Sequence, residues 1–185
     1  MKKMSTLNIS IVGFGIALNI IGAFIALNLR LPIFLDSIGT IMVSFILGPI
    51  YGVITGLLGS IVSGITFDIY SLYFAPVQIF TGLLGGIMYK KGFMKGAKMP
   101  LGVLAVSIFS SFIGAVIAAF LFGGITSSGS TYIVQFLSGL GVNKVVSVFI
   151  VQFTTDYADK FVAVSLAMTV ILGIPGALKQ RLVRS

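Results

Sequence analysis

Long apolar runs, separated by short polar segments, account for most of this chain. A helix that crosses the hydrocarbon of a bilayer needs ~20 mostly apolar residues. Six candidate transmembrane spans fit within the 185 residues, at about 7–29, 36–48, 49–66, 75–89, 101–123 and 159–178. Hydrophobic residues make up 57% of the sequence and charged residues 9%, whereas soluble domains average about 45–50% apolar and ~25% charged residues. The sequence therefore predicts an all-α integral membrane protein with a single membrane domain, and it excludes a soluble or disordered chain.

Prolines mark the expected helix boundaries, because a proline costs least in the first turn of a helix. Those that lie before or at the start of a span are Pro32, Pro49, Pro76 and Pro100, while Pro175 lies in the last turn of the final span. The second span is short, and its boundary with the third depends mainly on Gly48 and Pro49. A further apolar stretch at 133–155 is interrupted by polar residues and glycines. We expect it to belong to a long outer loop, 124–158, that carries an amphipathic helix near 143–153.

Basic residues are distributed unevenly over the two sides of this six-span arrangement. With both termini in the cytoplasm, the inner side carries Lys2, Lys3, Lys90, Lys91, Lys95, Lys98, Lys179, Arg181 and Arg184. The outer side carries only Arg30, Lys144 and Lys160. Loops rich in Lys and Arg stay in the cytoplasm, so both termini are expected there. A seventh span at 133–155 would move the C-terminal basic residues outside, so six spans are preferred.

The residue types that carry most enzyme chemistry are scarce. The sequence has no Cys and no His, and its four acidic residues are Asp36, Asp68, Asp156 and Asp159. It therefore offers no thiol nucleophile, imidazole base or ordinary zinc site, and we expect neither a metal nor a cofactor. The formal net charge is +8, but the basic residues flank apolar runs instead of covering one face. A nucleic-acid partner is therefore not expected.

Carboxylates and tyrosines collect on one side of the predicted bundle. All four Asp residues lie at the outer ends of spans or in outer loops, where they are joined by Tyr70, Tyr73, Tyr132 and Tyr157. The inner side carries lysines without acidic partners. Charge at membrane depth is costly, and it often marks a ligand or ion pathway. Any binding site is therefore expected to open outward.

Small residues recur every three or four positions on three of the predicted spans. One stripe on the third span consists of Gly48, Gly52, Gly56 and Ser60, and a second on the fourth span consists of Gly82 and Gly86. Such stripes let helices approach closely in lipid, so we expect them to pack inside the bundle. The first span has small residues on two faces: one carries Gly15, Asn19, Gly22 and Ala26, and the other carries Gly13 and Ala17. Contact with a partner protein and two contacts within the bundle explain these faces equally well.

Residues 31–40 read LPIFLDSIGT, and they are followed by GPIYG at 48–52, TGLLG at 55–59 and LYFAPVQ at 72–78. These motifs resemble the substrate-binding S component of an energy-coupling factor (ECF) transporter. LDSIGT followed by GPxxG is the most specific part. The length, the six expected spans, the cytoplasmic termini and the basic segment after the fourth span fit as well. The resemblance therefore covers nearly the whole chain.

The resemblance implies a multi-pass bundle in the bacterial cell membrane that captures a vitamin or a similar micronutrient at its outer face. It implies partners, a transmembrane T component and two cytoplasmic ATPases, because the chain itself has no Walker A motif. In this family, small residues on the first helix contact the T component. The expected contact face here is the one formed by Gly15, Asn19, Gly22 and Ala26.

The resemblance also implies a pocket between the outer halves of the later helices, closed by loops. Carried onto this sequence, the candidate pocket residues are Arg30, Asp68, Tyr70, Tyr73, Gln78, Asn143, Gln152, Asp156, Asp159 and Lys160. Aromatic rings with a few polar groups suit a small molecule. The sparse charge favours a neutral or weakly charged one, such as a corrinoid, a pyridoxine-type vitamer, or a nucleoside- or queuine-like base.

Several polar residues also have a purely structural explanation. Asp36 is expected to cap the second span, and Asp156 with Asp159 resembles a cap of the final one. Lys160 need not pair with its neighbour Asp159, and its side chain is long enough to reach the membrane surface. The two tyrosines, Tyr70 and Tyr73, suit an aromatic belt as well as a pocket. Gln78 lies in an apolar span and needs partners if it is buried, so it is expected to line the pocket.

Two other functional classes were weighed against the S component. A membrane enzyme acting on lipid needs clustered carboxylates, a Ser–Lys pair or His, and only Asp156 and Asp159 share a face. A channel needs polar residues repeated along one helix face, whereas here only the small residues repeat. The sequence therefore favours a substrate-capture protein with no chemistry of its own.

Overall fold

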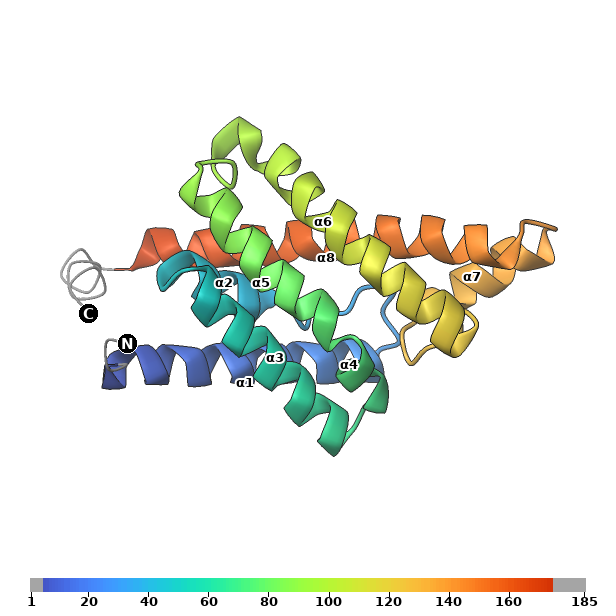
Figure 1. Ribbon diagram of the computed structural model, residues 1–185, viewed down its shortest axis with the longest axis horizontal. Coiled ribbons are helices and arrows are strands. Elements are labelled where there is room, and N and C mark those ends of the chain that lie inside the picture. Colours follow the sequence, from blue (N-terminus) through green and yellow to red (C-terminus); the bar gives the residue numbers. More distant parts are fainter. Residues whose placement is uncertain (1–4, 175–185) are drawn as a thin grey trace.

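The computed structural model describes residues 5–174, and every regular element in this part of the chain is a helix (Figure 1). The main helices are α1 (Thr6–Asn28), α2 (Ile38–Ile46), α3 (Pro49–Thr66), α4 (Ile69–Tyr73), α5 (Ala75–Lys90), α6 (Met99–Val116), α7 (Ser130–Gly139) and α8 (Lys144–Gly173). The short turn η1 (Gly96–Lys98) precedes α6, and a π-helical turn η2 (Ile117–Leu121) continues it. The expected all-α class is confirmed. The terminal basic residues and Pro175 lie outside the described residues.

In the part of the chain that the structure describes, three helical stretches are long and apolar enough to cross a membrane: Thr6–Asn28, Pro49–Thr66 and Gly96–Leu121. Large apolar side chains point outward from them, and Phe14 on α1 and Phe112 on α6 are each about 60% exposed, at 59% and 61%. Buried polar residues are as numerous as buried apolar ones. Large apolar surfaces and buried polar groups are the informative departures from a soluble protein. The protein is thus a helical bundle whose outer surface suits lipid.

The expected second span is a short buried helix. At nine residues, α2 is only about 14 Å long at 1.5 Å per residue, which is less than half of the ~30 Å hydrocarbon core. It packs against α1, α3, α5 and α8, and residues 39–45 are all buried. The short span expected at 36–48 is therefore a helix that does not reach across the hydrocarbon core, and neighbouring helices cover its residues 39–45.

The last helix is longer than expected. The sequence predicted an amphipathic helix near 143–153 in a loop and a separate span from 159, but α8 runs without a break through 30 residues. At 1.5 Å per residue it is about 45 Å long. No proline or glycine interrupts residues 144–172, so nothing in the sequence ends the helix before its polar segment. Asp156, Asp159 and Lys160 consequently lie in the middle of α8 and not at its start.

Glycines set the close approach of α3 and α5. A β-carbon built on Gly82 would lie 2.5 Å from the carbonyl carbon of Gly52, and one on Gly86 would lie 2.8 Å from the α-carbon of Pro49. Only glycine allows the two backbones to come this near, which maximises packing where no hydrophobic effect drives helices together. The prediction that these stripes pack inside the bundle is confirmed.

The small face of α1 also points into the bundle. Gly15, Asn19, Gly22 and Ala26 are all buried. A β-carbon on Gly15 would lie 2.5 Å from the side chain of Val43, and one on Gly22 would overlap the carbonyl of Leu35. The prediction that this face contacts a partner is therefore wrong: α2, α3 and the loop before α2 already cover it.

The two ends of the bundle differ in charge. In Figure 1 the start of α1, the end of α8 and the turn between α5 and α6 lie toward the left of the view, whereas α7 and the start of α8 lie at the right. The turn on the left carries Lys91, Lys95 and Lys98, all exposed. The described carboxylates lie elsewhere, on α4, on α8 and in the loop before α2.

Candidate functional site

A pocket forms where the loop before α2, α4, α5, the loop before α7, and α8 meet. Its atom-free space, counted together with the part that is open to solvent, is about 430 Å³. The lining residues are Phe34, Asp36, Asp68, Tyr70, Ser71, Phe74, Val77, Gln78, Thr126, Ser127, Gln152, Asp156 and Lys160. Five segments that are distant in sequence therefore build one site.

A buried lysine holds two carboxylates together at the inner wall of this pocket. The Lys160 ammonium lies 2.7 Å from Asp156 Oδ1 and 3.3 Å from Asp159 Oδ2. Residues four apart on a helix face the same side, which brings Asp156 to Lys160, and the flexible lysine chain also reaches Asp159. Only 1% of Lys160 is exposed. The structural alternative, in which Lys160 reaches the membrane surface, is therefore wrong, and Lys160 does pair with its neighbour Asp159.

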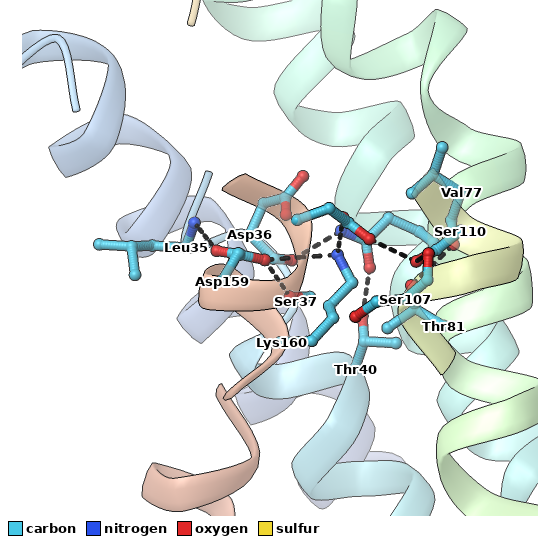
Figure 2. Close-up of polar contacts among 12 residues, drawn as sticks. Leu35, Asp36, Ser37, Thr40, Val77, Thr81, Ser107, Ser110, Asp159 and Lys160 are labelled. Carbon is cyan, nitrogen blue, oxygen red and sulfur yellow. Dashed lines mark hydrogen bonds and ion pairs between the residues drawn. The ribbon is translucent and has the colours of Figure 1, made fainter. Parts of the chain in front are cut away.

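The two carboxylates also fix the segments on either side of α8. Asp159 accepts hydrogen bonds from the backbone N–H of Leu35 at 2.7 Å and from Ser37 Oγ at 2.8 Å (Figure 2). Asp156 Oδ2 accepts from Ser110 Oγ at 2.5 Å and Ser111 Oγ at 2.9 Å, both on α6. Leu35 has a φ of +53°, a backbone region that is costly for residues with a side chain. These bonds hold the loop in that conformation, so neither carboxylate caps a helix as expected.

A second polar chain connects α1, α2 and α5. Asn19 accepts from the backbone N–H of Gly39 at 2.8 Å, and its amide donates to Thr40 Oγ1 at 2.8 Å. Thr40 in turn donates to Gln78 Oε1 at 2.9 Å, and Gln78 Nε2 donates to the carbonyl of Asp36 at 3.2 Å. Asn19 and Gln78 are both about 2% exposed. Gln78 thus lines the pocket, as the sequence predicted, with its amide orientation fixed by partners on both sides.

Two carboxylates lie nearer the pocket opening. Asp36 was expected to cap α2, but the N-cap position belongs to Ser37, whose side chain caps no backbone N–H. The Asp36 residue lines the pocket instead. Asp68, at the start of α4, accepts from Ser71 Oγ and from Ser127 Oγ, each at 3.0 Å. It therefore connects α4 to the loop before α7 while lining the pocket.

Aromatic rings form the remaining wall. Phe34 and Phe74 have ring centroids 6.1 Å apart, and Tyr70 packs on Phe122 at 4.7 Å. Phe74 is 8% exposed, so its ring is held firmly between α5 and the loops. Tyr70 belongs to the pocket, whereas Tyr73, which is half-exposed, does not line it and has its ring centroid 5.2 Å from that of Phe122.

Four of the predicted site residues lie outside this lining. Arg30 donates to the hydroxyl of Tyr132 at 2.8 Å near the end of the bundle. Asn143 caps α8, accepting from the backbone N–H of Val145 at 3.0 Å. Tyr73 lies behind Phe122, and Asp159 lies behind the pocket wall, where it holds the loop before α2. The structure brings together the other six: Asp68, Tyr70, Gln78, Gln152, Asp156 and Lys160.

Sequence reasoning missed several lining residues. These are Ser71, Phe74, Val77, Thr126 and Ser127, together with Asp36, which was expected to be a cap. Phe74 and Val77 belong to the LYFAPVQ motif beside Gln78, and that proximity is a usable signal. Thr126 and Ser127 lie in a short polar loop whose position depends on the ends of η2 and α7. Nothing local in the sequence indicates that this loop folds over the pocket.

Within residues 5–174, no group of three or more acidic side chains is placed to bind a metal ion. The chain matches no protein-family model, no curated protein and no solved structure.

Proposed function

We propose that this chain is the substrate-capture subunit, or S component, of an ECF-type importer, and that it binds a vitamin-like organic molecule in the pocket between α5 and α8. The observation that carries the proposal is the pocket itself. It combines aromatic walls with fixed polar groups, such as the amide of Gln78, in the interior of a membrane bundle. Apolar bulk provides affinity and the few polar groups set orientation.

The polar network favours binding over catalysis. The Lys160 ammonium is held by two carboxylates, which leaves it charged and unsuited to act as a base. Asp156 already accepts from two serine hydroxyls, and Asp159 from a backbone N–H and a hydroxyl. Satisfied buried networks give rigid, unique structures. A rigid receptor that selects one ligand needs such a wall.

The pocket dimensions restrict the ligand. Its space is narrow and totals about 430 Å³ with the opening included. A single or fused heteroaromatic ring with polar substituents suits this space, as in a pyridoxine-type vitamer or a nucleobase. A corrinoid macrocycle is larger than this space, so the proposed ligand is one of the smaller molecules.

Transport requires partners, because the sequence has no Walker A motif. We propose a T component and two ATPases, with the chain oriented so that the lysines of the α5–α6 turn face the cytoplasm of a bacterial cell. Since the Gly15 face of α1 is buried, the T component would dock on the opposite face. That face carries Gly13 and Ala17, both exposed, and Gly13 has open space around its α-carbon.

Purification tests the proposal. The protein is isolated in mild detergent without added ligand, and denatured extracts are examined by mass spectrometry for a stoichiometric small molecule. Gln78→Ala should reduce that occupancy, whereas the exposed Gln135→Ala on α7 should not. Lipid turnover or ion flux in vesicles that contain this chain alone would contradict the capture function and favour the enzyme or the channel.

A further inference from the structure

The charges around the pocket do not balance. All four carboxylates of the sequence lie at or directly behind its wall, whereas Lys160 is the only basic residue among the described ones that lines it. The rest of the chain has the opposite bias, with 12 basic residues and a net charge of +8. Gathering every acidic residue at one buried site is costly in a membrane protein. The excess negative charge therefore needs a compensating group.

Asp36 and Asp68 are the carboxylates without an ion pair. Among the described residues the ion pairs are those of Lys160 with Asp156 and Asp159. Asp68 accepts only from neutral serine hydroxyls, which leave its charge in place. Both residues line this pocket and also the adjoining space of about 310 Å³ toward α1. They therefore lie at the junction of the two spaces, where a bound molecule meets both.

Gln152 places an amide on the pocket wall. It is 5% exposed and lines the pocket, where its amide lies against Gly114 on α6, 2.8 Å from the position that a β-carbon there would occupy. Within residues 5–174 the buried side-chain atoms without a partner are Ser107 Oγ and Ser138 Oγ, so the Gln152 amide is not an orphaned group. It offers a donor and an acceptor to a ligand in the pocket.

The aromatic wall is also suited to positive charge. Phe34, Tyr70 and Phe74 line the same space as Asp36 and Asp68. Aromatic faces attract cations, and the attraction is stronger away from water. Carboxylates combined with aromatic rings are a recognition set for an organic cation, since no group of three acidic side chains within residues 5–174 is placed for a metal ion.

We infer, on the basis of the proposed function, that the captured molecule is a flat organic cation. Its protonated nitrogen lies against Asp36 and Asp68, its ring packs on Phe34 and Phe74, and a polar substituent bonds to the Gln152 amide. This replaces the expectation from the sequence of a neutral or weakly charged ligand. The sequence alone does not show that carboxylates from the loop before α2, from the start of α4 and from α8 meet at one pocket.

A matched set of probes tests the charge of the ligand. Benzamidinium, benzamide and benzoate share one ring and differ mainly in charge, and each is titrated at millimolar concentration against the purified full-length protein while thermal stability is recorded. Benzamidinium alone should raise the melting temperature. Stabilisation by benzamide or benzoate without benzamidinium would overturn the cationic ligand while leaving the capture function standing. No stabilisation by any of the three would contradict both.

Variants identify the groups that bind the probe. Asp36→Asn keeps the shape and removes the charge, and it should weaken benzamidinium binding at least about tenfold, or ~1.4 kcal/mol. Gln152→Leu should leave benzamidinium binding nearly unchanged, because this probe carries no substituent for the Gln152 amide, and so should Gln135→Leu, on the exposed side of α7. Asp68→Asn is the second charge variant, in case Asp36→Asn does not fold, as judged by gel filtration. Unchanged affinity in both aspartate variants would overturn the inference.

Discussion

Replacing Lys160 by methionine should destabilise the bundle strongly. The ammonium lies 2.7 Å from Asp156 and 3.3 Å from Asp159, and both carboxylates are at most 1% exposed. Methionine keeps most of the volume but leaves the carboxylates without their cation in the middle of α8. Removing one partner of a buried ion pair costs about 3–5 kcal/mol. For a chain of this size, each kcal/mol lowers the melting temperature by roughly 2–4 °C.

The expected decrease in melting temperature is therefore about 6–20 °C. Thermal aggregation of the detergent-purified protein, followed by gel filtration after heating, measures it. Lys91→Met is the matched control, since Lys91 is exposed on the α5–α6 turn and surface changes usually stay within about 0.5 kcal/mol.

A double variant separates loss of charge balance from loss of packing. Asp156→Asn retains an oxygen for Ser110 and Ser111 and removes one unpaired charge. Lys160→Met with Asp156→Asn should therefore be more stable than Lys160→Met alone, by about 0.5–3 kcal/mol, the range of coupling between contacting residues. Two results would contradict a stabilising role for the buried network. One is a melting temperature of Lys160→Met equal to that of Lys91→Met. The other is a double variant, Lys160→Met with Asp156→Asn, that is less stable than Lys160→Met alone.

Three further results are expected. Gly82→Val should prevent the close contact of α3 and α5 and lower the yield of folded protein, whereas Gly139→Ala, which meets open space on α7, should leave gel filtration unchanged. Asn143→Ala removes the cap of α8 and should lower the free energy of unfolding by about 1 kcal/mol. It should leave the affinity for benzamidinium unchanged, and a loss of affinity would show that Asn143 takes part in binding. Gln78→Ala should weaken the same binding at least about tenfold (~1.4 kcal/mol), and unchanged titration curves would remove Gln78 from the pocket.

The helical class and several packing contacts were predictable from the sequence. The apolar composition indicates a lipid environment. The small-residue stripes that contain Gly52 and Gly82 indicate close helix packing within the bundle, and the structure shows that they face each other between α3 and α5. Helix lengths were less predictable. Because α2 is apolar throughout, its sequence does not distinguish a helix buried in protein from one that faces lipid. Its burial depends on α1, α3, α5 and α8 packing around it.

The site was predictable only where a residue conflicted with its surroundings. Gln78 stood out because an amide within an apolar span needs partners, and it has them. From the sequence, Asp36 was expected to cap a helix and Asn143 to line the pocket, whereas in the structure Asn143 caps α8 and Asp36 lines the pocket. Both types cap helices well, so local sequence cannot assign them. The choice depends on which segment the loops bring to the pocket.

Cysteine accessibility in intact cells tests the central claim that the pocket faces the cell exterior. The sequence has no cysteine, so maleimide labelling of a variant with one introduced cysteine reports the accessibility of that position alone. Gln135→Cys, at the end of the bundle beside the pocket loops, should react with a membrane-impermeant maleimide in intact cells. Lys91→Cys, on the lysine-rich turn, should react only after the cells are permeabilised. The reverse pattern would contradict both capture from outside and docking of partners at the cytoplasmic side.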